Sequence, residues 1–336
     1  MGVHRMAEQS EKPPKSRRAI YWIVALALAG VFLYFSLRGI QWLQVWTIVR
    51  GARLGFVALT LGTISLALFV RAMRWRVLLR AEGKVPVPLA FWATAAGYFG
   101  NNLLPARAGE VVRTLMVSRQ SGLGKAFVLT TALSERVMDA IVLISISAVV
   151  LLTLPARPGW LAHAARPFAL LGLGGVVAIA LVPVFESFWF KCLERLPIPT
   201  GLRHHVEDAL RQGLRGIRSL HDVSRLSRFL LATAVIWSLD GLSTIVSAHA
   251  IGLSISPSVA FLLLAGLGLG SALPSTPGYV GIYQFVAVSI LTPFGVGKND
   301  AIAFILLFQA TIYIVVMTWG LASLGQQRKA PALEGE

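Results

Sequence analysis

The chain has 336 residues, of which 56% are hydrophobic and only 14% are charged, and its mean hydropathy is +0.70. These values exclude an ordinary soluble domain, in which about 25% of residues are charged, and predict an integral membrane protein. The formal net charge of +16 does not indicate nucleic-acid binding, because the basic residues gather in segments between apolar stretches.

Six apolar stretches are long enough to form full transmembrane helices, since a helix crosses the bilayer with roughly 20 residues. They cover residues 19–37, 54–70, 140–154 with an upstream extension to about 126, 167–185, 229–251 and 301–325. The first follows Arg17 and Arg18, but no small-residue cleavage site follows it. We therefore interpret it as a retained anchor and not as a signal peptide.

Two further segments fit poorly as simple spans. The first covers about 86–118 and contains Asn101, Asn102 and Pro105. The second covers about 256–296, within 57 residues that lack Asp, Glu, Lys and Arg, and is interrupted by SALPSTPGYVG. We interpret both as broken or re-entrant hairpins.

The basic residues predict the orientation. Six lie in the connections that we assign to the outside, against 24 in the tails and the other segments, and cytoplasmic loops are enriched in Lys and Arg. We expect both tails, 1–18 and 326–336, on the cytoplasmic side of one membrane domain at 19–325. The two broken segments then have opposite polarity. The expected fold is an all-α polytopic membrane protein with about six full transmembrane helices and two hairpins in an inverted repeat.

The segment at about 186–228 is predicted to include a helix on the anionic inner leaflet. Apolar residues recur at helical spacing between basic ones; they are Val206, Leu210, Leu214 and Ile217, with Arg211, Arg215 and Arg218 around them. Nearby His and acidic residues are interpreted as a solvated face, so no metal site is expected. Cys192 is the only cysteine, which leaves no disulfide within one chain.

The two broken segments share a short motif. LPARAGEVV at 104–112 and LPSTPGYVG at 273–281 both read L-P-x-x-x-G-x-V, with Pro105 and Pro274 separated by 169 residues. Interrupted segments at corresponding places in inverted halves indicate the substrate site of a transporter.

Three motifs together resemble a known family. They are NNLLPARAGEVVR at 101–113, ALSERVMDAIVL at 132–143, and LPSTPGYVGIYQ at 273–284 with FGV at 294–296. They are similar to the flippase-type transmembrane domain of lysylphosphatidylglycerol synthases, a family that includes hopanoid-associated and archaeal glycolipid-associated members. The resemblance covers about 19–325 and implies lipid translocation across a prokaryotic cytoplasmic membrane. Bifunctional members carry a soluble aminoacyl-transferase domain, whereas eleven residues follow Gly325 here, so we expect no lysyl-lipid synthesis by this chain.

The turns of the two motifs are predicted to face a common site. A helix that begins after Pro105 leaves its first N–H groups unpaired, and proline suits a first turn because it has no N–H. If Pro274 or Pro277 starts a matching helix, two positive helix ends converge and attract phosphate. Gly109 and Gly278 are predicted to hold these turns.

Arg107, Glu110 and Arg113 are three residues apart and share a helix face. Arg107 can donate charge-assisted hydrogen bonds to an anionic headgroup while Glu110 balances its charge. The alternative is that both arginines snorkel at the cytoplasmic interface. The predicted headgroup site consists of Asn101, Asn102, Arg107, Glu110, Arg113, Tyr279, Tyr283 and Gln284, with core packing as the alternative for Tyr283.

Four charged residues lie within apolar spans and are candidates for gating or proton coupling. Glu135, Arg136 and Asp139 belong to SERVMD, for which the alternative is a self-neutralising structural cluster. Asp240 stands alone in VIWSLDGLSTIV. We expect it to pair with Arg107 or Arg136.

The sequence predicts a flippase that binds a membrane lipid with an anionic or phosphate headgroup. No Walker loop, serine-hydrolase elbow or HExxH motif is present, so we expect no cofactor and no enzyme activity. The alternatives are a membrane-embedded transferase acting on a polyprenyl-phosphate or phospholipid donor, and a non-transporting scaffold of a lipid-synthesis complex. A homo-oligomer or a lipid-synthesis partner is compatible with the sequence.

Overall fold

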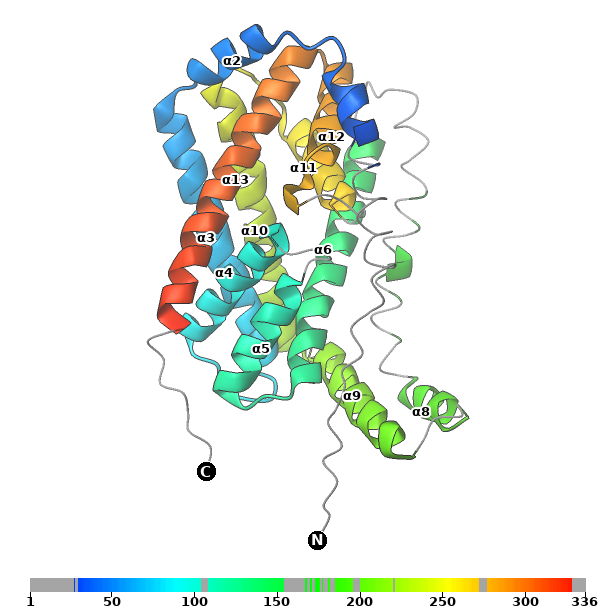
Figure 1. The fold of residues 1–336 in the computed structure, drawn as a ribbon. Coiled ribbons are helices and arrows are strands. Elements are labelled where there is room, and N and C mark those ends of the chain that lie inside the picture. Colours follow the sequence, from blue (N-terminus) through cyan, green and yellow to red (C-terminus); the bar gives the residue numbers. More distant parts are fainter. Residues whose placement is uncertain are drawn as a thin grey trace.

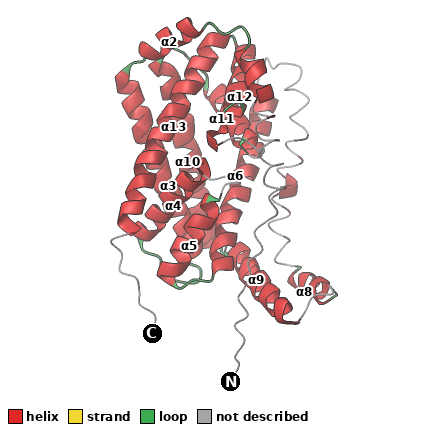
Figure 2. Cartoon of the chain, viewed as in Figure 1, coloured by secondary structure: helices red, strands yellow, loops and turns green. Residues whose placement is uncertain are grey.

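The computed structural model describes residues 27, 30–103, 108–153, 167, 170, 173–175, 177, 181, 185–195, 200–219, 221–271 and 277–327. These residues form helices joined by short loops and contain no strand (Figures 1 and 2). The predicted spans 19–37 and 167–185 lie largely outside the described residues.

Long helices run through the height of the molecule (Figure 1). They are α3 (Leu54–Leu79), α6 (Lys125–Thr153), α10 (Val223–Ala250) and α13 (Lys298–Gln327). Among the described helices, α3, α10 and α13 are long and apolar enough to cross a membrane. The 29 residues of α6 extend over about 43 Å at ~1.5 Å per residue, although several of them are charged. The all-α membrane fold predicted from the sequence is confirmed.

Two pairs of shorter helices fill opposite halves of the molecule. Helices α4 (Val87–Leu103) and α5 (Gly109–Ser121) pack together in the lower half, whereas α11 (Pro257–Gly270) and α12 (Ile282–Leu291) pack together in the upper half (Figure 1). The 17 residues of α4 span about 26 Å at ~1.5 Å per residue. These hairpins correspond to the two broken segments, and their re-entrant membrane topology stays a prediction.

Local sequence explains where these elements begin and end. The Asp222 carboxylate accepts a hydrogen bond from the Arg225 N–H at 2.7 Å and caps α10. The Ser256 hydroxyl accepts one from the Val259 N–H at 3.3 Å and caps α11. Helix α5 ends at Gly122, whose φ of 71° suits glycine. Caps of this kind satisfy backbone groups that a helix end leaves unpaired.

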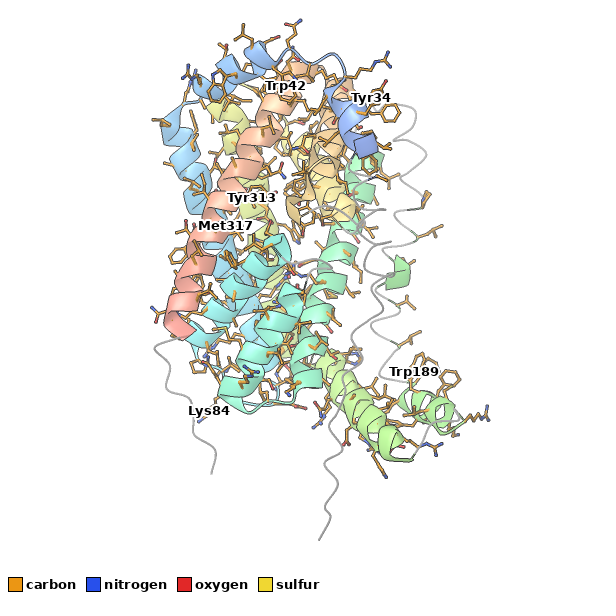
Figure 3. The ribbon with its side chains drawn as sticks, viewed as in Figure 1. Tyr34, Trp42, Lys84, Trp189, Tyr313 and Met317 are labelled. Carbon is orange, nitrogen blue, oxygen red and sulfur yellow. The ribbon has the colours of Figure 1, made fainter. Side chains whose placement is uncertain are left out.

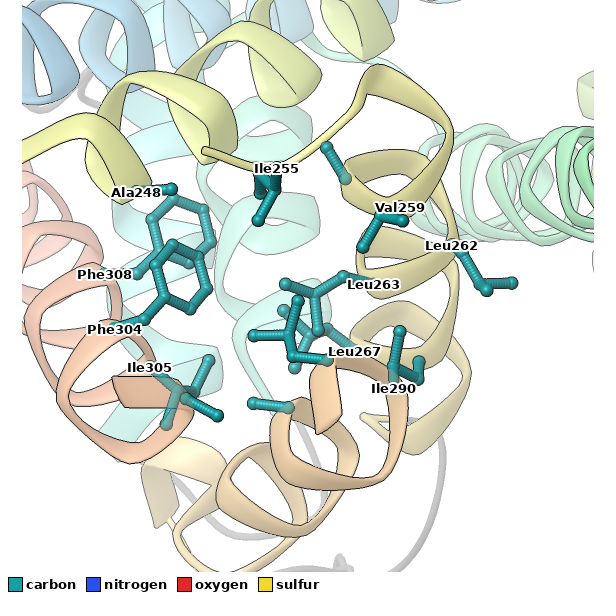
Figure 4. Close-up of a cluster of buried hydrophobic side chains, with 14 of the residues drawn as sticks. Ala248, Ile255, Val259, Leu262, Leu263, Leu267, Ile290, Phe304, Ile305 and Phe308 are labelled. Atoms are coloured by element: carbon teal, nitrogen blue, oxygen red, sulfur yellow. The ribbon is translucent and has the colours of Figure 1, made fainter. Parts of the chain in front are cut away.

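Apolar clusters hold each hairpin against the long helices. In the upper half, Leu263 and Leu267 of α11 pack with Ile290 of α12 and with Phe304 and Phe308 of α13 (Figure 4). The lower cluster joins α3 to α6 around the α4–α5 hairpin; its buried members include Trp75, Leu79, Ala93, Val117 and Phe127. Each hairpin is therefore a packed part of the bundle.

The ends of the bundle carry short helices. Helix α2 (Trp42–Arg50) lies at the upper end, where Trp42 is labelled, and Lys84 lies at the lower end with α8 (Glu186–Glu194) and α9 (Thr200–Arg218) (Figures 1 and 3). Leu214 of α9 is buried, α9 packs on α6, and Arg215 pairs with Glu82 at 3.2 Å. A helix is therefore present within 186–228, and its position on the inner leaflet stays a prediction.

Candidate functional site

Among the described residues, Arg74 of α3 is the arginine with the most side-chain hydrogen bonds in the interior. Its Nη1 and Nη2 donate to Asp139 Oδ1 and Oδ2 at 2.6 and 2.8 Å, and its Nε donates to Glu135 Oε1 at 3.2 Å. Nη1 also donates to Thr233 Oγ1 at 3.1 Å. The guanidinium carbon lies 4.9 Å from the centre of the Phe229 ring. Arg74 therefore ties α3 to both α6 and α10.

Arg113 of α5 contacts the other oxygen of the Glu135 carboxylate. Its Nη1 donates to Glu135 Oε2 at 2.9 Å, and its Nε donates to Glu110 Oε2 at 2.5 Å. The guanidinium carbon lies 4.4 Å from the centre of the Trp75 ring. Gly97 of α4 leaves room for the Arg113 stem, since a Cβ there would lie 3.0 Å from Arg113 Cδ. Glu135 thus bridges two arginines from different helices.

Arg136 of α6 closes a ring of contacts with α4 and α5. Its Nε donates to Glu110 Oε1 at 2.9 Å and its Nη1 donates to Tyr98 Oη at 3.2 Å. Asn101 Nδ2 donates to Glu110 Oε1 at 3.3 Å. The Asn101 Oδ1 atom is buried and accepts no hydrogen bond from the described residues. Glu110 thereby holds three neighbours in place.

Arg71 of α3 and Asp240 of α10 form a two-point ion pair, with Nη1 and Oδ1 3.3 Å apart. The Tyr98 ring lies between Arg71 and Arg136, 6.0 and 5.0 Å from their guanidinium carbons. We call the whole set the arginine–carboxylate network; it consists of Arg71, Arg74, Arg113, Arg136, Glu110, Glu135, Asp139 and Asp240. Its four positive and four negative charges balance, which lets so many ionisable groups share a bundle interior where an unpaired charge is costly.

The network unites residues that the sequence placed in two groups. Glu110 and Arg113 were predicted near the headgroup, and Glu135, Arg136 and Asp139 at a gate. Among the described residues Asp240 pairs with Arg71 and not with Arg136, whereas Arg107, its other predicted partner, lies outside the described residues.

Sequence reasoning missed Arg71, Arg74 and Tyr98. Both arginines follow the apolar run 54–70 and were counted among the 24 basic residues of the tails and cytoplasmic segments, although α3 continues past them to Leu79. Their spacing of three residues, which places both on one helix face, was the available signal. No comparable signal existed for Tyr98.

Other predicted residues lie at the edge of the network or outside the described part. Pro105, Arg107 and Pro274 are outside the described residues. Asn102 Nδ2 donates to the Tyr98 carbonyl oxygen of its own helix at 2.9 Å. Gly109 lies against α4, since a Cβ there would overlap the Gly97 carbonyl oxygen and approach the Asn101 nitrogen to 2.6 Å.

Side chains of α12 and α13 form hydrogen bonds to the turn at residues 277–281, which lies in the second broken segment. The Gly278 carbonyl oxygen accepts hydrogen bonds from Gln309 Nε2 at 2.5 Å and from the Tyr313 hydroxyl. Gln284 Nε2 donates to Gln309 Oε1 at 2.9 Å, and Gln284 Oε1 accepts from the Gly281 N–H at 2.8 Å. Gln284, which was predicted to line the site, is buried and has both amide atoms engaged within the protein.

The backbone of this turn is unusual. Gly278 has a φ of 77° and Tyr279 a φ of 61°, a region that side chains disfavour. Pro277 begins only the short 3₁₀ helix η2 (Pro277–Tyr279), and the α-helix α12 begins at Ile282, so no α-helix starts directly at Pro277. The rings of Tyr279 and Tyr283 stack with centres 5.0 Å apart. Because η2 packs against α4, the second turn reaches the first hairpin.

The described residues contain no group of three His, Cys, Asp or Glu side chains arranged to hold a metal ion.

These features define a polytopic helical membrane protein with two opposed hairpins and a buried ion-pair network. Residues 22–320 match the model of the lysylphosphatidylglycerol synthase transmembrane region. The chain belongs to this family, which confirms the resemblance of the three motifs.

A curated relative changes the expectation about enzyme activity. The glycosyltransferase AglD of Haloferax volcanii is 24% identical over 351 residues, which cover 93% of this chain and 55% of the relative. The chain therefore spans about half the length of that protein. The expectation that the chain is not an enzyme is contradicted by this relative, because it is named for glycosyl transfer. Family membership assigns the chain a role connected with membrane lipids.

Proposed function

We propose that the chain translocates a phosphate-containing lipid between the leaflets of a prokaryotic cytoplasmic membrane. The observation that carries this proposal is the arginine–carboxylate network, which lies where the α4–α5 hairpin packs against α3 and α6 and where α3 packs against α10. Ionisable groups inside a membrane domain are costly and commonly mark a substrate or ion pathway.

The headgroup binds between the two turns in this proposal. The first turn of α5 follows residues 104–107, and its N-cap residue Ala108 provides no side-chain hydrogen bond to the first N–H groups. Its N–H groups attract an anion, and Arg107 adds a bidentate donor. Tyr279 and Tyr283 form the opposite wall, because η2 packs against α4. The lipid tails remain in the bilayer while the two hairpins open in turn toward each leaflet.

The orientation follows from charge. The end of the bundle that carries Lys84 and α9 faces the cytoplasm, since basic segments favour that side. The exposed basic residues of α9 then contact anionic lipids of the inner leaflet.

Substitution of Arg107 tests the headgroup role. Arg107→Lys keeps the charge but loses the bidentate fork, so the initial rate of lipid translocation in proteoliposomes should fall about tenfold, and Arg107→Gln should nearly abolish it. Arg218→Gln is the matched control, because Arg218 is an exposed residue of α9. Equal rates for wild type and Arg107→Lys would return Arg107 to the role of an interfacial anchor, where lysine serves as well.

Transfer of a group to or from a polyprenyl-phosphate or phospholipid is the second candidate. It is favoured by the name of the Haloferax volcanii relative. The same vesicles, loaded with labelled anionic and zwitterionic lipids, discriminate between the candidates. Leaflet exchange of an unchanged lipid supports translocation, a covalently changed lipid supports the transferase, and neither outcome supports a scaffold.

A further inference from the structure

Arg136 differs from the other arginines of the network in its exposure. Its side chain is 33% exposed, against 2% for Arg74, 2% for Arg113 and 17% for Arg71. Its described carboxylate partner is Glu110 alone, through one hydrogen bond, whereas Arg74 and Arg113 each contact two carboxylates. Of the four arginines in the network, Arg136 therefore has the most exposed side chain and the fewest hydrogen bonds to carboxylates.

The position of Arg136 makes this exposure significant. It lies eleven residues after the start of α6 at Lys125, about 16 Å along the helix at ~1.5 Å per residue. Leu133, its neighbour three residues earlier on the helix surface, is an exposed apolar side chain of the kind that faces lipid. An exposed guanidinium at this depth requires water or an anion beside it.

Two further groups beside Arg136 have unused hydrogen-bonding capacity. Tyr98 Oη accepts a hydrogen bond from Arg136 Nη1, and no acceptor for its own hydroxyl hydrogen is found among the described residues. Asn101 Oδ1 is buried and lacks a donor among the same residues, but as an acceptor it does not contribute to binding an anion. A tyrosine hydroxyl and a guanidinium fork side by side are the donors that a phosphate oxygen pair accepts.

We propose that Arg136 and Tyr98 form an exchangeable anion site, in which a phosphate group replaces Glu110 at the Arg136 guanidinium. Glu110 keeps a partner after the exchange, because Arg113 Nε contacts its other oxygen at 2.5 Å. Asn101 continues to hold Glu110 on the side of α4. The rest of the network stays paired, since Arg74, Glu135 and Asp139 do not contact the exchanged oxygen.

This site rests on the proposed function for the identity of its ligand, a phosphate-containing lipid. Binding of a phosphate group at Arg136 can be measured without lipid transport. The phosphate can belong to a lipid headgroup or be a free anion, and the chemistry at Arg136 is the same. Full-length protein in a maltoside detergent is titrated with inorganic phosphate in one arm and with dihexanoyl phosphatidylglycerol in the other, by isothermal titration calorimetry.

Two substitutions at the same ion pair should change affinity in opposite directions. Arg136→Gln should abolish binding, because it removes the guanidinium. Glu110→Gln should tighten binding about tenfold, equivalent to about 1.4 kcal/mol, because it removes the competing carboxylate. Tyr98→Phe removes one hydroxyl and should weaken binding several-fold. Arg50→Gln should bind like the wild type, because Arg50 is an exposed residue of α2 at the other end of the bundle.

The outcomes separate cleanly. An ion pair with only a structural role predicts that Glu110→Gln never binds more tightly than the wild type. Unchanged or weaker binding in Glu110→Gln overturns the assignment, as does retained binding in Arg136→Gln. If Glu110→Gln does not fold, unchanged affinity in Tyr98→Phe overturns it instead.

Binding of the lipid identifies a headgroup site and binding of inorganic phosphate alone a free-anion site, and failure of both probes rejects the assignment. Binding without lipid translocation rejects only the proposed function, whereas translocation without Arg136-dependent binding rejects only this site.

Discussion

The ion pair between Arg71 of α3 and Asp240 of α10 provides a direct measure of what the network contributes to stability. Each residue has the other as its described salt-bridge partner, and the two side chains are 17% and 15% exposed. We consider the two single substitutions Arg71→Met and Asp240→Leu and the double substitution, which replaces the pair by apolar side chains.

The expected values follow from burial. Removing one partner of a buried pair costs about 3–5 kcal/mol because the other charge is left uncompensated, and partial exposure places this pair at the lower end, at about 3 kcal/mol for each single substitution. The double substitution leaves no buried charge and should cost only about 1 kcal/mol. The double variant is therefore expected to lose much less free energy of unfolding than the sum of the two single losses, which would be about 6 kcal/mol.

The measurement is the free energy of unfolding on titration of sodium dodecyl sulfate into mixed micelles, followed by tryptophan fluorescence. Arg218→Gln is the control for an exposed pair, since Arg218 contacts Glu186 at the surface of α9 and should change the free energy by less than about 0.5 kcal/mol. Additive losses in the double variant would refute the reasoning, because they would mean that Arg71 and Asp240 contribute independently and not as a pair.

Further predictions concern the turns and the topology. Gly278→Val should leave little folded protein on size-exclusion chromatography, because valine disfavours a φ of 77° and its Cβ would overlap the Tyr313 hydroxyl. Gly109→Val should also leave little folded protein, because α4 lies too close for a side chain at this position. Normal yields and normal transport in both variants would show that the two glycines are ordinary packing residues. In a background without the native cysteine, Lys84→Cys and Arg119→Cys should react with an impermeant maleimide from one side of oriented vesicles, because both flank the proposed re-entrant hairpin. Labelling from opposite sides would reject the re-entrant topology.

Much of the fold was predictable because the bilayer imposes strong rules on composition. Apolar runs at 54–70, 229–251 and 301–325 correspond to α3, α10 and α13, although α3 continues nine residues further to Leu79. The extension shows where the rule fails. An apolar-run criterion ends a span at Arg71, whereas a helix continues through charged residues when partners from other helices neutralise them.

The arginine–carboxylate network was predictable in part for a related reason. Charged residues are rare within membrane helices unless they have a function, so the charges of NNLLPARAGEVVR and SERVMD marked these motifs as candidates. Their separation of some twenty residues gave no indication that Glu110 and Arg136 are in contact. That contact depends on the α4–α5 hairpin folding back against α6, which is a packing result.

The sequence by itself determined that the protein lies in a membrane, that it is helical, which family it belongs to and which residue types occur at the site. Each of these depends on local composition and short motifs. Only the tertiary structure decided which charges pair. An arginine can satisfy its charge with any carboxylate that reaches it, and pairing depends on which helices pack together and on the depth of each residue. Arg71 therefore pairs with Asp240 across 169 positions, Arg74 with Asp139 across 65, and Arg136 remains partly exposed beside Tyr98.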